Sequence, residues 1–111
     1  VWVTATAATG SVVAGNFVGT NAGGSAAVAN GFHGVYVQGP GVRVGGGTAA
    51  ARNVISGNTL NGVAVEGAAG TVIAGNWVGL AADGTTKLGN GTQAVIVFSG
   101  ATDTRIGTDG D

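Results

Sequence analysis

Two stretches of the sequence decide the fold: VVAGNFVGTNAGG at residues 12–24 and VIAGNWVGLAADG at residues 72–84, which lie 60 residues apart. Of the 28 aligned pairs that begin with these stretches, 12 are identical. Some identity is expected in a chain with 24 glycines, but the asparagines Asn16 and Asn76 match as well. A repeat of this kind indicates an array built by stacking similar units.

Three kinds of short strand recur in a fixed order inside the repeat. The first kind is VWVT, GVYVQG, GVAVEG and AVIVFS (from residues 1, 34, 62 and 94), the second is VVAGN, VRVGG, VIAGN and TRIGT (from 12, 42, 72 and 104), and the third is FVGT, NVISGN and WVGL (from 17, 53 and 77). Period-two alternation between glycine or polar turns is typical of short strands with one buried face. One turn of the array is therefore expected to have three strands and about 30 residues.

These strands predict an all-β chain that folds as a parallel β-helix, a solenoid in which like strands stack about 4.8 Å apart. No segment shows a helical period with caps. Residues 1–111 are expected to form one array of roughly four coils. Two long loops, 20–33 and 80–93, are expected to leave the same corner two coils apart, the side where such arrays carry recognition.

Four strings resemble the right-handed parallel β-helix repeats of large secreted or surface-anchored prokaryotic proteins, within the pectate-lyase-like group. They are ARNVISGN (51–58), GVAVEG (62–67), VIAGNWVG (72–79) and the GNG (89–91) that precedes the next strand. The resemblance covers nearly the whole chain, and it implies a right-handed helix and an extracellular or cell-surface location. Because the group includes lyases, hydrolases, phage tailspikes, adhesins and passive stalks, it implies no single activity.

Alignment of the first kind of strand separates a predicted core from a predicted outer face. The core positions are the valine columns Val1, Val35, Val63, Val95 and Val3, Val37, Val65, Val97. The outer apolar face carries Trp2, Tyr36, Ile96 and Phe98. Three interpretations stay open for it: isolated apolar residues of the ordinary kind, a face that associates with a neighbour, or a face on which Trp2 and Tyr36 stack against sugars.

Asparagines are expected at the corners between strands. Asn16 and Asn76 take equivalent corners two coils apart, and the coil between them offers Gly46. This alternation favours asparagine as a residue that accepts a left-handed backbone over a continuous asparagine ladder. Asn58 is expected at a corner as well.

The first and last strands are expected to present open edges. An isolated solenoid normally covers its ends with a helix, charged residues or proline, and neither end shows such a cap. Val1 and Val3 at one end, and Arg105 and Ile106 at the other, are therefore predicted to stack on a further coil. The expected partner is a flanking coil of a parent chain or a second copy stacked head to tail into a filament.

The ionisable residues do not suggest catalysis. Glu66, Asp83 and Asp103 do not share a column, whereas glycoside cleavage needs carboxylates that converge on one bond. No catalytic residue is predicted. A net charge of -1 with 8% charged residues offers no basic track for nucleic acid, and no apolar run approaches the roughly 18 residues of a membrane span.

No cofactor or metal is expected. Asp109 and Asp111 look like the start of a calcium loop, but they supply too few oxygen ligands for that ion. His33 has no cysteine or second histidine to share a metal, so it is interpreted as a structural or solvent-facing loop residue. Asn90 begins the sequon Asn-Gly-Thr, a formal glycosylation site.

Together these patterns favour a non-catalytic structural segment of an extracellular stalk, adhesin or filament that stacks end to end. The alternative is a carbohydrate-binding or polysaccharide-processing β-helix module, whose partner is a glycan. A column of carboxylates or aromatic residues within one groove would distinguish the second from the first.

Overall fold

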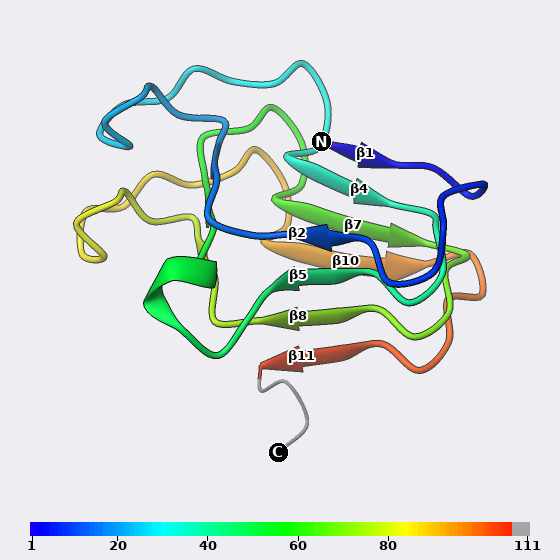
Figure 1. The fold of residues 1–111 in the computed structure, drawn as a ribbon. Helices are drawn as coiled ribbons and strands as arrows, with labels where there is room; N and C mark the ends of the chain where they lie inside the picture. Colours follow the sequence, from blue (N-terminus) through cyan, green and yellow to red (C-terminus); the bar gives the residue numbers. More distant parts are fainter. Residues whose placement is uncertain (108–111) are drawn as a thin grey trace.

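Eleven short strands form three parallel sheets in the computed structural model, which describes residues 1–107 (Figure 1). Sheet A contains β1 (Trp2–Val3), β4 (Val35–Val37), β7 (Val63–Glu66) and β10 (Val95–Phe98). Sheet B contains β2 (Val12–Val13), β5 (Arg43–Gly45), β8 (Val72–Ala74) and β11 (Arg105–Gly107). Sheet C contains β3 (Phe17–Val18), β6 (Val54–Ile55) and β9 (Trp77–Val78).

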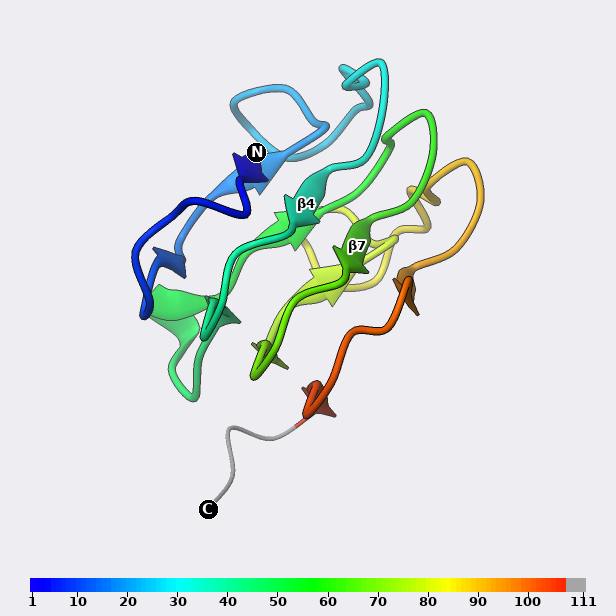
Figure 2. The ribbon, with the colours of Figure 1, turned by 90° about the vertical axis from the view of Figure 1, so that its right-hand side faces the viewer.

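The chain visits sheets A, B and C in turn, so it winds as a solenoid of three complete turns followed by the sheet A and sheet B strands of a fourth. Figure 2 shows the successive turns stacked one beside the next. Partner residues in sheet A are 34, 28 and 32 positions apart. The predicted parallel β-solenoid with three strands per coil is confirmed. One short 3-10 helix, η1 (Ala49–Ala51), was not predicted.

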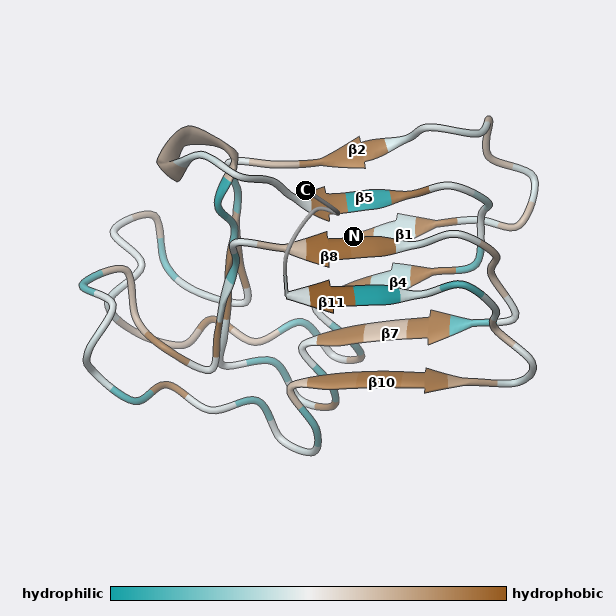
Figure 3. Cartoon of the chain, turned by 90° about the horizontal axis from the view of Figure 1, so that it is seen from below, coloured by the Kyte–Doolittle hydropathy of each residue, from teal (hydrophilic) through white to brown (hydrophobic). Residues whose placement is uncertain are grey.

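The core lies inside the stacked turns, where each sheet contributes a column of β-branched residues. In Figure 3 the ribbons of β8 and β10 are coloured as hydrophobic. In sheet A, Val35, Val37, Val63 and Val65 are fully buried, which confirms the predicted columns in the interior turns. The other fully buried apolar residues include Val44 of sheet B and Ile55 of sheet C. Each such side chain stabilises the fold by roughly 1.5–3 kcal/mol relative to exposure.

The valine columns do not stay buried at the two ends of the solenoid. Val1 is 52% exposed and Val97 is 40% exposed, because neither has a described strand stacked on its outer side. Between two residues of the outer face of sheet A, one position is buried instead of exposed. Ala64 is fully buried, because Tyr36 and Ile96 flank it in register on the neighbouring strands.

The corner between sheets B and C corrects the prediction about asparagine. In the first and third turns this corner is short, but in the second turn the chain makes an excursion that contains η1 before it reaches Asn53. Asn53, and not Gly46, is therefore the counterpart of Asn16 and Asn76. The amide of Asn16 donates to Oδ1 of Asn53 over 3.1 Å, and the amide of Asn53 donates to Oδ1 of Asn76 over 2.9 Å.

A continuous asparagine ladder thus runs along this corner, and a second ladder runs along the corner between sheets C and A. The amide of Asn30 donates to Asn58 over 2.8 Å, and that of Asn58 donates to Asn90 over 2.9 Å, so Asn58 belongs to a different corner from Asn16 and Asn76.

The left-handed backbone that was expected of the corner asparagines is taken by glycine. At the first corner it falls on Gly15 and Gly75, with φ of 71° and 67°. None of Asn16, Asn58 and Asn76 has a positive φ. Because Gly lacks a Cβ, it takes this conformation without the steric cost that an asparagine would meet.

Candidate functional site

The outer face of sheet A carries four rings in contact, here called the aromatic cluster: Trp2, Phe32, His33 and Tyr36. Trp2 and Tyr36 stack with their centroids 5.9 Å apart and their planes 15° from parallel. The long loop 20–33 leads into β4 and brings Phe32 and His33 against Tyr36. Their ring centroids lie 5.7 Å and 5.1 Å from that of Tyr36. Trp2 is 64% exposed. The aromatic cluster therefore forms an apolar surface of which Trp2 and Phe32 are exposed and His33 and Tyr36 are half-buried.

Polar side chains border the aromatic cluster and connect to it. Trp2 Nε1 donates to Gln38 Oε1 over 2.8 Å, and Gln38 Nε2 donates to Glu66 Oε2 over 3.0 Å. The Tyr36 hydroxyl donates to the same carboxylate oxygen. This hydrogen bond raises the pKa of Tyr36 above its usual value, because loss of the proton would place two negative charges side by side.

His33 has a structural contact that fits its interpretation as a loop residue. Its Nδ1 lies 3.1 Å from Nδ2 and 3.4 Å from the backbone nitrogen of Asn61, both of which carry hydrogens to donate. Nδ1 is therefore the acceptor, which leaves the ring proton on Nε2. Burial lowers the pKa of His33, and the charge of Glu66 opposes that effect.

The predicted outer apolar face divides into two parts. Trp2 and Tyr36 join the aromatic cluster, whereas Ile96 and Phe98 lie half-buried on β10, opposite Ala64 and Glu66. Sequence reasoning missed Phe32 and His33 as members of the cluster. Their position three or four residues before an outward-facing tyrosine was the available signal.

The residues predicted to stack at the ends lie on the terminal strands of their sheets. Val3 is the last residue of β1 and Val1 directly precedes that strand, and Arg105 and Ile106 lie on β11. Ile106 is 58% exposed although it is in register with the buried Ile73. The side chain that would be core in an interior turn is thus open at this end.

A cavity of about 320 Å³ opens at the same end, between β9 and β11. Its apolar lining comes from Ile73, Val78, Val95 and Ile106, and its polar lining from the corner residues Gly75 and Asn76. It is a continuation of the solenoid interior, beyond the last strand of sheet C.

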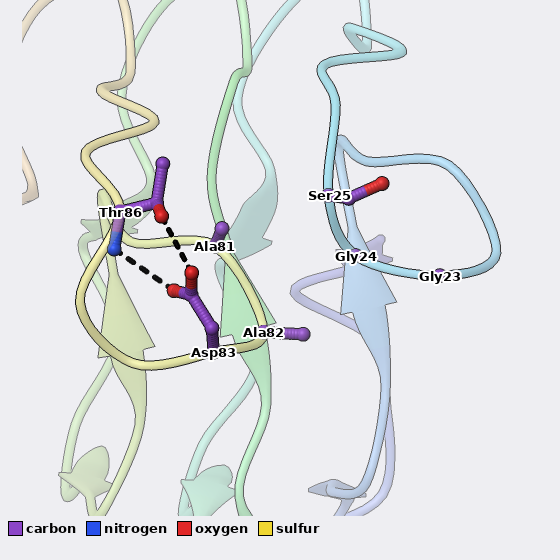
Figure 4. A pocket seen from close by; sticks show the side chains of 7 residues that line it. All are labelled: Gly23, Gly24, Ser25, Ala81, Ala82, Asp83 and Thr86. Atoms are coloured by element: carbon purple, nitrogen blue, oxygen red, sulfur yellow. Dashed lines mark hydrogen bonds between the residues drawn. The ribbon is translucent and has the colours of Figure 1, made fainter.

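A second hollow, of about 340 Å³, lies between the two long loops (Figure 4). The loops contact each other directly, since the Ala82 amide donates to the Gly24 carbonyl over 2.9 Å. Asp83 lines this hollow, but its carboxylate turns back to its own loop and accepts from the Thr86 hydroxyl and from the amides of Thr85 and Thr86. These bonds hold the pKa of Asp83 at about 2.

The remaining ionisable candidates lie on separate elements. Glu66 ends β7, Asp83 lies in a loop, and Asp103 lies in the turn before β11. Among residues 1–107, no three His, Asp or Glu side chains gather closely enough to hold a metal ion. The calcium candidates Asp109 and Asp111 lie outside the described residues.

The sequon asparagine is part of a ladder. Asn90 Nδ2, the atom that would carry a glycan, donates to the Ile55 carbonyl over 3.0 Å. Its Oδ1 accepts from the backbone and side chain of Asn58. Attachment of a glycan at Asn90 would require this half-buried contact to open.

Within the described part of the chain, no helix has the length and apolar character that a membrane-spanning helix needs. Comparison of the chain with protein-family models, with curated proteins and with solved structures finds no match.

Proposed function

We propose that the chain is a non-catalytic structural segment of an extracellular or cell-surface β-solenoid, and that its end faces stack on further coils of the same repeat. The partner coil belongs to the same polypeptide or to a second copy of it. The resemblance to secreted and surface-anchored prokaryotic β-helix repeats supports the location and the stalk, adhesin or filament role.

One observation carries this proposal: the columns of β-branched residues that pack between the interior turns continue, with the same residue types, to the two end faces. The valine columns of sheet A run out to Val1 and Val97, and the sheet B column runs out to Ile106. Exposed β-branched side chains beside an unpaired strand edge favour the addition of another strand. In the interior turns, the same residue types are covered by such a strand.

The test is a concentration series of the purified chain, followed by light scattering and negative-stain electron microscopy. We expect narrow, unbranched fibres, and we expect Ile106→Lys to abolish them because it places a charge on the end face. Ala50→Lys is the matched control, since it adds the same charge at an exposed position in the second turn. A chain that stays monomeric throughout the series contradicts the proposal.

Glycan binding is the second candidate, and the aromatic cluster favours it. Stacked rings beside a carboxylate and an amide provide an apolar platform with polar groups at its border. The test is affinity electrophoresis in gels that contain neutral or acidic polysaccharides. Retardation that is lost in Trp2→Ala and kept in Phe98→Ala would support it, and equal mobility with and without polysaccharide would contradict it.

A further inference from the structure

The fourth turn of the solenoid lacks one strand position within residues 1–107. Sheets A and B each have four strands, whereas sheet C ends at its third strand, β9. The cavity of about 320 Å³ lies beside this missing position, and its lining includes Val78 of β9 and Ile106 of β11. We call this cavity, together with the open edge of β9, the β9 groove.

The polar groups along the β9 groove repeat those that pair in the turns before it. The backbone N–H of Asn16 donates to Oδ1 of Asn53 over 3.0 Å, and that of Asn53 donates to Oδ1 of Asn76 over 3.1 Å. The backbone N–H of Asn76 is next in this series, and it has no acceptor among residues 1–107. The groove therefore presents a hydrogen-bond donor, the N–H of Asn76, to the side-chain oxygen of an asparagine in a following turn.

The carbonyl groups along β9 are also left for a following strand, as the pairing of the earlier sheet C strands shows. The amides of β6 and Ser56 donate to the carbonyls of Asn16 and Val18, and the amides of Trp77 and Gly79 donate to those of Asn53 and Ile55. By this register the carbonyls of Asn76 and Val78 are the acceptors for one more parallel strand.

We propose that the β9 groove binds an extended segment with the pattern Asn, two β-branched residues and Ser, which pairs parallel to β9 and completes the turn. The repeat argues for this occupant, because β9 is the counterpart of β3, and the strand that pairs with β3 is β6, with the sequence Asn-Val-Ile-Ser at residues 53–56. The bound asparagine accepts from Asn76. The second β-branched residue fills the groove, as Ile55 does in the column of Val18 and Val78.

This inference rests on the proposed function, because it names the chemistry of the strand that the end face accepts. The probe is a capped peptide of residues 51–58, Ala-Arg-Asn-Val-Ile-Ser-Gly-Asn, titrated into the isotope-labelled full chain and followed by amide NMR spectra. We expect saturable shifts at Asn76, Val78 and Val95. The same peptide with Ile55→Asp should bind at least tenfold more weakly, since it places a charge in an apolar groove.

Two protein variants control the site of binding. Ile106→Lys should abolish the shifts, and Ala50→Lys should leave them unchanged, with circular dichroism confirming that both variants fold. No shifts at millimolar peptide, or shifts centred on β3 at the opposite end of sheet C, would overturn the inference.

The peptide and fibre experiments fail separately. Fibres without peptide binding overturn the β9 groove and leave the proposed function standing. Peptide binding by a chain that never associates, with or without peptide, contradicts stacking and supports the groove.

Discussion

Replacement of Asn53 by alanine tests whether the asparagine ladder stabilises the stacked turns. The Asn53 side chain is fully buried and makes four hydrogen bonds. It accepts from the backbone and side-chain nitrogens of Asn16 over 3.0 and 3.1 Å, and it donates to the Val13 carbonyl over 2.8 Å and to Asn76 Oδ1 over 2.9 Å. Alanine removes all four and leaves the carbonyl of the buried Val13 without this donor. A net hydrogen bond contributes about 0.5–1.5 kcal/mol and an unsatisfied buried group costs about 1–3, so we expect Asn53→Ala to lower the free energy of unfolding by about 3 kcal/mol.

Asn16→Ala is the matched control at the exposed end of the same ladder. Its backbone N–H still donates to Asn53 after the substitution, so a loss of at most about 1 kcal/mol is expected. Both variants are measured by urea unfolding, followed by far-ultraviolet circular dichroism and tryptophan fluorescence. The asparagine ladder does not stabilise the stacked turns if the free energy of unfolding of Asn53→Ala lies within about 0.5 kcal/mol of that of the parent chain. The same conclusion holds if Asn53→Ala lowers this free energy no more than Asn16→Ala does.

Three further predictions concern single groups. Burial lowers the pKa of His33, so the unfolded chain binds its proton more tightly; stability should fall as the pH drops below about 6.5, and urea midpoints from pH 7.5 to 5 should show a smaller fall in His33→Gln. The Thr86 hydroxyl holds the pKa of Asp83 at about 2, so a carboxyl NMR titration of Thr86→Val should give a midpoint shifted up toward 3.8. Val65→Ala should cost about 2 kcal/mol in the closed interior, whereas Val97→Ala at the open end should cost less than about 1, as measured by urea unfolding.

The sequence predicted the strands, their three kinds and their parallel stacking, because period-two alternation and a 60-residue repeat report directly on which faces are buried. It placed Val37 and Val65 correctly inside the solenoid. At Val1 and Val97 the same columns reach the ends of sheet A and are exposed, because no described strand covers them there.

The sequence pattern did not show which residue of the second turn pairs with Asn16, and the reason is physical. Motif alignment placed Gly46 opposite Asn16, because the glycines that follow β5 resemble in sequence the corner residues of the other turns. The excursion through Ala49–Ala51 displaces the true counterpart to Asn53.

The aromatic cluster was only half predicted. The column of Trp2 and Tyr36 follows from strand alternation, but the contacts of Phe32 and His33 depend on the path of a loop that has no period. Loop paths are set by tertiary contacts that local sequence does not encode.

Electron cryomicroscopy of the assembled chain would show which surfaces meet between molecules, and so whether the end faces stack. We expect the end with β10 and β11 to meet the end with β1 and β2, and the strand spacing of about 4.8 Å to continue across the junction. Molecules that meet instead through the aromatic cluster or the long loops would contradict this expectation, as would a chain that remains a monomer at every concentration.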